Sequence, residues 1–325
     1  MSEKRPATRA SLKQKARYLP NIALFALTCV TVAKAATDLF GPETSWFAPV
    51  QLGGRLFSTW PFVLSLMGTL LAHEMGHYLV ARFHGVEAGL PIFIPIPFGM
   101  GTFGAVIAMP PTNDRNKLVD IGAAGPLAGL IVAIPVLIYG LMHSQIGPRV
   151  SGLLEGNSLL YLGIKLLITG KMLPGDGLDV QLHPVAFAGW AGLLVTMVNL
   201  MPIGQLDGGH IAYAYFGRRQ DITSRWLQRL LLPFAIVVYA YVVVEHVFRG
   251  ISWIHAILAG LGAAVWIVWW GMLHLLRRFT GGGGHPPVND GPLTAARRRL
   301  CIFMAVLFIL LFMPIPLRRY LTRSV

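Results

Sequence analysis

Long apolar runs constrain this chain more than any other feature of its sequence. A helix needs about 20 apolar residues to cross a hydrocarbon core about 30 Å thick, and residues 118–142 reach that length with Asp120 as their single charge. Apolar residues make up 54% of the chain and charged residues only 13%, which is about half the charged share of a soluble domain. Further runs lie at residues 21–37, 60–83, 184–202, 230–247, 251–276 and 300–311. We therefore predict an all-α polytopic membrane protein with about six to eight transmembrane helices.

The segment 84–117 is also apolar, but it cannot be one helix. Pro91, Pro95 and Pro97 interrupt it, because proline lacks the backbone N–H and clashes with the preceding helical turn. Irregular backbone at membrane depth is tolerated only where protein or water satisfies its polar groups. A small membrane-embedded β-hairpin or re-entrant segment is therefore expected here.

Basic clusters between the apolar runs account for the net charge of +13. They form neither a compact basic face nor a recognition motif, so no nucleic-acid partner is expected. Cytoplasmic loops of membrane proteins are enriched in Lys and Arg, which puts the N-terminus and the later basic loops in the cytoplasm. The basic tail after residue 317 then falls on the opposite side, which is a misfit. The clusters lie at residues 4–17, 218–229, 277–278 and 297–299.

The pattern His73-Glu74-Met75-Gly76-His77 lies inside the apolar run 60–83. Residues four apart share one face of a helix, so both imidazoles can bind one zinc ion at about 2.0–2.1 Å. Glu74 follows the first ligand, where it can act as general base on a zinc-bound water. In the alternative interpretation, the two histidines and Glu74 only hydrogen-bond one another within a helix bundle. The pattern favours the metallopeptidase chemistry, because these residues are costly at membrane depth without a function.

Two histidines leave zinc undercoordinated, so a third protein ligand is required. His84 lies seven residues after His77, which does not match the known spacing of a third histidine. Asp207 is the better candidate, because glycines and Pro202 interrupt the helix around it and a buried carboxylate without a metal is costly. One predicted span separates the two motifs, so both approach the cytoplasmic side of the membrane.

Together these motifs resemble the site-2 protease family of intramembrane zinc metalloproteases, in its branch without a PDZ module. The likeness covers about residues 60–250 and includes Asn199, Pro202, Leu206, Asp207 and Gly208, with a further match at residues 120–129. It implies that His73, His77 and Asp207 bind Zn²⁺ and that Glu74 is the base.

The resemblance also implies roles for residues outside the ligand set. Asn199 would steady the oxyanion or the substrate backbone; its alternative role is an interhelical hydrogen bond. Gly101, Thr102, Phe103 and Gly104 match the family's membrane hairpin, whose edge would hold an extended substrate; the alternative is a purely structural hairpin.

The expected protein is therefore an intramembrane zinc metalloendopeptidase. Its substrate would be a single-span membrane protein within the lipid bilayer. A catalytically silent chaperone or scaffold of the same fold and a metal transporter are the alternatives. Residues 1–59 would form a tail, first span and loop, residues 60–250 the catalytic core, and residues 251–325 the C-terminal spans and linker.

The predicted location is a bacterial cytoplasmic membrane, with the active site toward the cytoplasm and an organelle as the alternative. No small-residue cleavage site precedes Asp38, so the first apolar run is expected to remain in the protein. The sequence leaves the oligomeric state open.

Overall fold

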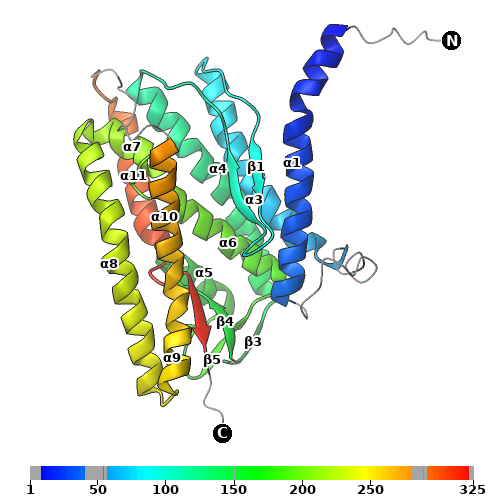
Figure 1. Cartoon of the computed structure of the whole chain (residues 1–325), viewed down its shortest axis with the longest axis vertical. Helices are drawn as coiled ribbons and strands as arrows, with labels where there is room; N and C mark the ends of the chain where they lie inside the picture. The colour runs from blue at the N-terminus through cyan, green and yellow to red at the C-terminus, as the bar shows by residue number, and fades with distance from the viewer. Residues whose placement is uncertain are drawn as a thin grey trace, which may run out of the picture.

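A computed structural model describes residues 9–40, 54, 57–149, 151–279, 288 and 291–321. Most of the described chain is helical, and the long helices run along one axis (Figure 1). The tail before residue 9, most of the loop 41–56 and most of the linker 280–290 lie outside the described residues.

Three helices form the centre of the bundle: α3 (Trp60–Phe83), α4 (Arg115–Met142) and α6 (Pro184–Asn199). Glycines bring their backbones close together, because a Cβ on Gly140 would lie 2.1 Å from the Ala186 nitrogen and one on Gly189 would lie 2.6 Å from the Leu137 Cα. Such small-residue contacts are typical of helices packed within membranes. Most of α6 is buried as a result.

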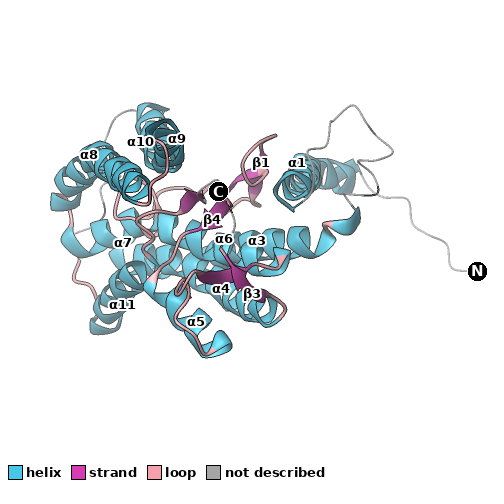
Figure 2. Cartoon of the chain, turned by 90° about the horizontal axis from the view of Figure 1, so that it is seen from below, coloured by secondary structure: helices cyan, strands magenta, loops and turns pink. Residues whose placement is uncertain are grey.

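Helices α1 and α8–α10 flank this centre on opposite sides, as Figure 2 shows. The predicted apolar run 251–276 is divided by a short 3₁₀ turn, and α11 runs back along the bundle toward the C-terminus (Figure 1). The flanking and C-terminal elements are α1 (Arg9–Phe40), α7 (Asp207–Phe216), α8 (Arg219–Phe248), α9 (Trp253–Gly260), η1 (Leu261–Ala263), α10 (Ala264–Phe279) and α11 (Ala295–Leu311).

The hairpin expected within 84–117 is confirmed as β1 (Ile92–Pro95) paired antiparallel with β2 (Thr102–Val106). It is attached to α1, because the Thr31 hydroxyl donates a hydrogen bond of 2.6 Å to the Gly101 carbonyl. Gly101 has a positive φ of 84°, and a Cβ there would lie 2.4 Å from the Val32 Cα. Glycine is needed at this position for both reasons.

Two further sheets were not predicted from the sequence. The strand β3 (Gln145–Pro148) pairs with β5 (Leu178–Gln181), and β4 (Gly152–Glu155) pairs with β6 (Leu317–Tyr320). These strands have four residues each, too short to show a clear alternation of apolar and polar residues. With the short helix α5 (Leu159–Thr169), they form the end of the bundle where the C-terminus lies (Figure 1).

Four of the described helical segments have the length and hydropathy to cross a membrane: Tyr18–Phe40, Arg115–Met142, Arg219–Phe248 and Trp253–Leu275. The predicted number of six to eight is therefore supported only in part. Helix α3 is long enough, but His73, Glu74 and His77 lower its hydropathy. Helices α6 and α11 have 16 and 17 residues, fewer than a full crossing needs.

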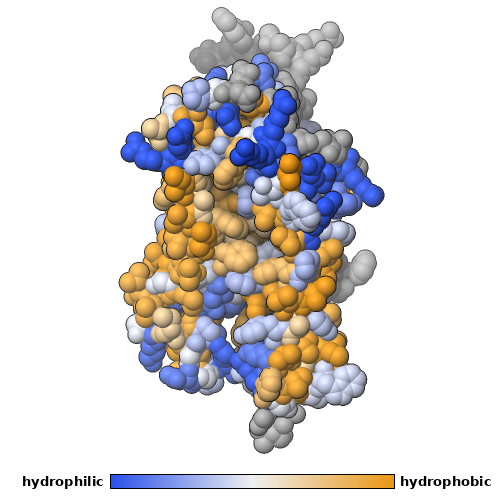
Figure 3. Space-filling model, turned by 90° about the vertical axis from the view of Figure 1, so that its left-hand side faces the viewer, coloured by the Kyte–Doolittle hydropathy of each residue, from blue (hydrophilic) through white to orange (hydrophobic). Residues whose placement is uncertain are grey.

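The ends of the bundle are hydrophilic and its middle is an apolar band, as one face shows in Figure 3. We call one end the basic end; the starts of α4, α8 and α11, each of which carries arginines, lie there, at the top of Figure 1. Strand β6 lies toward the opposite end, and its Arg318 pairs with Glu245 of α8. This ion pair, together with the β4–β6 pairing, accounts for part of the charge misfit noted from the sequence.

Candidate metal centre

The structure brings His73, His77 and Asp207 together, as the sequence predicted. The two histidines lie one turn apart on α3, and Asp207 is the first residue of α7. The Nε2 atom of His73 is 3.2 Å from Oδ2 of Asp207, Nε2 of His77 is 3.3 Å from Oδ1, and the two Nε2 atoms are 3.2 Å apart. Among the described residues, these three form a group whose ligand atoms lie within 4.8 Å of one another.

This set of donor atoms fits a zinc ion. Ligands bound at about 2.0–2.2 Å in a tetrahedron are separated by about 3.3–3.6 Å, close to the distances observed. Among the described residues none donates a hydrogen bond to the buried Oδ2 of Asp207, which is costly for a carboxylate oxygen unless a cation lies beside it. Zinc also commonly binds the nitrogen of a neutral imidazole and the oxygen of a carboxylate.

Helix α4 orients the histidines. Nδ1 of His77 is 2.7 Å from the Ile121 carbonyl oxygen, which leaves Nε2 to bind the metal if Nδ1 carries the proton. A Cβ on Gly125 would lie 2.1 Å from Nε2 of His77, and one on Gly129 would lie 3.3 Å from the His73 Cβ. The small residues of segment 120–129 therefore allow α4 to pack directly against the histidine face of α3.

Glu74 and Asn199 lie at the same site. Glu74 is buried on α3 beside the first histidine and lines the adjoining cavity. Asn199 ends α6, and its amide nitrogen is 3.3 Å from Nε2 of His73. The side chain of Asn199 therefore faces the centre.

A cavity of about 510 Å³ adjoins the centre. The strand β2 contributes Ala105 and Val106 to its wall, whereas Gly101 packs against α1. The residues Gly101 to Gly104, predicted to hold substrate, thus lie at the end of the β1–β2 turn and in the first part of β2, whereas the hairpin residues that line the cavity follow them in the chain. Its other lining residues are His73, Glu74, His77, Val86, Ile107, Met109, Pro110, Pro111, Thr112, Leu118, Ile121, Gly122, Asn199, Gln205, Leu206, Asp207 and His210.

Sequence reasoning missed Gln205 and His210 among these lining residues. Both flank the predicted ligand Asp207. His210 lies one helical turn after Asp207, a spacing that could have indicated the same face of α7. His84 is outside the ligand group, and its Nε2 is 2.9 Å from Oδ2 of Asp120.

Comparisons with known proteins agree with this geometry. The model of Peptidase family M50 matches residues 61–242, more than half of the chain. The chain is 35% identical over 202 residues to "Probable zinc metalloprotease EGY2, chloroplastic" of Arabidopsis thaliana, which covers 61% of this chain and 35% of the relative. It is 36% identical over 169 residues to "Probable zinc metalloprotease EGY1, chloroplastic" of the same plant, covering 50% of this chain and 31% of the relative.

A third relative, "Probable zinc metallopeptidase EGY3, chloroplastic" of Arabidopsis thaliana, is 32% identical over 235 residues, covering 66% of this chain and 39% of the relative. The chain thus spans about a third of the length of the curated relatives it matches. The matched region contains both histidines, Glu74, Asn199 and Asp207. The chain therefore belongs to peptidase family M50, the site-2 protease family whose motifs its sequence resembles.

Proposed function

We propose that this chain is an intramembrane zinc metalloendopeptidase in which His73, His77 and Asp207 hold the ion. The observation that carries the proposal is the convergence of three metal-binding side chains from α3 and α7, with Glu74 beside them at a cavity. Family membership and the names of the relatives support the same activity.

The chemistry divides between the ion and the chain. A bound zinc ion lowers the pKa of water and polarises a carbonyl group. Glu74 is positioned to accept a proton from the attacking water and to return it to the nitrogen of the leaving amine. Asn199 would donate its amide N–H to the oxygen that becomes negative during attack.

The substrate would bind along β2. A transmembrane helix must unwind before its peptide bonds are accessible, and its freed N–H and C=O groups then need partners. Within the part of the chain that the structure describes, β2 pairs with β1 on one side and with no strand on the other, so its second edge is available for an added strand. Ala105 and Val106 at the cavity wall support the proposal that Thr102–Val106 hold an extended segment of a single-span membrane protein.

We further propose that α3, α6 and α11 cross the membrane with the four longer segments. Helices α3 and α6 lie in the middle of the bundle and are largely covered by protein, so a short or partly polar helix is tolerated there. The basic end would face the cytoplasm of a bacterium. The relatives are named as chloroplastic, so a plastid membrane is the alternative.

Two other activities are compatible with the same fold. A silent scaffold would not require Glu74, which lines the cavity beside the ligands. A metal transporter would require a polar path on both sides of the ion. The half of α3 before His73 offers only Ser65 and Thr69 as neutral hydroxyl groups, so a peptidase fits better.

Replacement of the base tests the activity. In Glu74→Gln the full chain, reconstituted in lipid with a tagged single-span substrate, should keep its zinc and lose about 10²- to 10⁴-fold in cleavage rate. Glu87→Gln is the matched control, because Glu87 is exposed and does not line the cavity. Undiminished cleavage by the Glu74 variant would remove Glu74 from the mechanism, and an absence of zinc from the unchanged chain would refute the proposal.

Loss of the Asn199 amide should have a smaller effect. Asn199→Ala is expected to lower kcat by about 10²- to 10³-fold, as is typical when an oxyanion donor is removed, with zinc content and KM nearly unchanged. A rise in KM alone would assign Asn199 to substrate binding, and unchanged kinetics would leave it only the structural role of a hydrogen bond between α6 and α3.

A further inference from the structure

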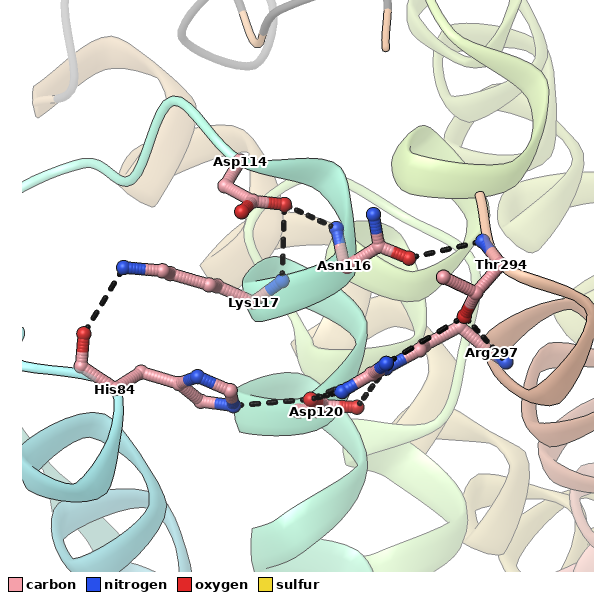
Figure 4. A network of polar contacts seen from close by, with 7 residues as sticks. All are labelled: His84, Asp114, Asn116, Lys117, Asp120, Thr294 and Arg297. Atoms are coloured by element: carbon pink, nitrogen blue, oxygen red, sulfur yellow. Dashed lines mark hydrogen bonds and ion pairs between the residues drawn. The ribbon is translucent and has the colours of Figure 1, made fainter. Parts of the chain in front are cut away.

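A second polar cluster lies at the basic end, outside the cavity. Figure 4 shows the side chains of His84 and Arg297 converging on Asp120 from the end of α3 and the start of α11. Nε of Arg297 donates to Oδ1 of Asp120 at 3.0 Å and Nη2 donates to Oδ2 at 2.7 Å. Such two-pronged pairing of a guanidinium with a carboxylate is strong and fixes the relative orientation of both groups. The third partner, His84, is held in turn by Lys117, whose ammonium donates to the His84 carbonyl at 3.0 Å.

The start of α11 is attached to the start of α4 at a second point. The Thr294 N–H donates to the side-chain oxygen of Asn116 at 3.0 Å, and the Asn116 amide donates to the Pro292 carbonyl at 3.4 Å. Asp114 caps α4 by accepting from the Asn116 N–H at 2.8 Å. The first two turns of α4 are therefore held by α11, which lies beyond the residues that the family model matches.

These turns of α4 lead directly to the metal centre. Asp120 precedes Ile121, whose carbonyl oxygen is the partner of His77 Nδ1 at 2.7 Å. The next residue, Gly122, borders α7, since a Cβ there would lie 3.5 Å from the Asp207 carbonyl oxygen. A rotation of the first turns of α4 would thus move the group that orients one ligand and the surface that supports another.

We propose that Arg297 is a positioning residue for the metal centre and acts through Asp120. The Arg297 guanidinium fixes the position of the Asp120 carboxylate, and this carboxylate keeps α4 in register with α3. The Ile121 carbonyl is then placed to select the orientation of His77 in which Nε2 faces the ion. The inference rests on the proposed zinc site. It assigns to the C-terminal helix a part in metal binding that the motifs in 60–250 do not contain.

The measurement is zinc affinity, with the full chain in lipid nanodiscs and a competing chelator. Groups that orient a metal-binding histidine are worth about 10- to 100-fold in metal affinity, and Arg297→Gln should weaken zinc binding by this factor. Arg297→Lys should recover part of this affinity, because lysine keeps the positive charge but lacks the two parallel N–H groups of the guanidinium. Arg298→Gln and Arg299→Gln are matched controls, since both side chains are exposed neighbours on α11, and both should bind zinc as the unchanged chain does.

A double substitution separates positioning from a general loss of folding. Asp120→Asn should weaken zinc binding as much as Arg297→Gln, and the two together no more than either alone, because they remove one shared interaction. Additive losses would overturn the proposal, as would equal zinc affinity in Arg297→Gln and the unchanged chain.

The ¹⁵N shifts of the His77 ring provide a readout that does not depend on zinc. They should report a proton on Nδ1 in the unchanged chain and a mixture of the two tautomers in Arg297→Gln. If Arg297→Gln does not fold, the same mixture is expected in Asp120→Asn. An unchanged tautomer in the variants would overturn the proposal. A chain that binds no zinc but shows this tautomer change would refute the proposed function while supporting the role of Arg297.

Discussion

The metal centre and a cluster at the opposite end of the bundle both bury ionisable side chains, and they differ in what they contain. The metal centre joins two imidazoles and a carboxylate, His73, His77 and Asp207, near the basic end. The far-end cluster joins Lys165, Glu155 and Asp179, where Lys165 Nζ is 3.7 Å from Oε1 of Glu155 and 3.8 Å from Oδ1 of Asp179. The first group consists of electron-pair donors that face one another, whereas the second contains its own cation.

Burial alone therefore does not mark a functional site. Burial lowers the pKa of the Lys165 ammonium and raises the pKa of the Glu155 carboxyl, but the attraction between the two groups opposes both shifts. The Tyr161 hydroxyl also donates to Glu155 at 3.0 Å. None of these residues lines the cavity beside the metal centre. The far-end cluster therefore contains a lysine that offsets the charge of its carboxylates, whereas the metal centre has no Lys or Arg among its three members and lies beside a cavity, which points to a ligand.

The largest difference between the metal centre and the far-end cluster is expected when one carboxylate is removed from each. Asp207→Ala should lower zinc affinity by more than about 100-fold, because a ligand itself is lost. A group that only orients a ligand contributes up to about 100-fold. Asp179→Ala should leave zinc affinity unchanged. Zinc content and a chelator titration measure both; full retention of zinc by Asp207→Ala would exclude that carboxylate as a ligand.

A smaller effect is expected from the glycine that backs the metal centre. The added methyl in Gly125→Ala would meet the His77 ring, and overpacking costs about 1–3 kcal/mol, or about 5- to 150-fold in zinc affinity if the imidazole must move. Gly68→Ala is the matched control on α3, since a Cβ there has no neighbour within 4 Å. Equal zinc affinities would show that α4 can shift without disturbing the ligand.

The far-end cluster should leave the metal centre unaffected. Lys165→Met removes the cation between two buried carboxylates, which is expected to lower stability by about 3–5 kcal/mol without changing the zinc affinity of the folded fraction. Thermal unfolding in lipid measures the loss of stability. A chelator titration below the unfolding temperature measures the zinc affinity of the folded protein. A stable variant with weakened zinc binding would reverse the roles that we assign to the two groups.

Much of the metal centre could be predicted because its signals are local. The spacing of His73 and His77 puts both on one face of any helix, and the residues around Asp207 match a second family motif. The hairpin β1–β2 was foreseen from its prolines. The number of crossings was harder to predict, since α3 and α6 are central helices whose polar or short sequences fall outside the length and hydropathy that mark a candidate span.

The sequence by itself determined the class of protein and the candidate zinc ligands and base, because these depend on apolar composition, on the spacing of His73 and His77 and on the motif around Asp207. Only the tertiary structure decided which groups hold those side chains in place. The carbonyl of Ile121 that orients His77 has no side-chain signature, and Asp120 meets Arg297 across 177 positions of sequence. Strand β6 likewise pairs with β4 although α5 to α11 separate the two strands in the sequence. Contacts of this kind arise from the packing of whole helices, which no short window of residues encodes.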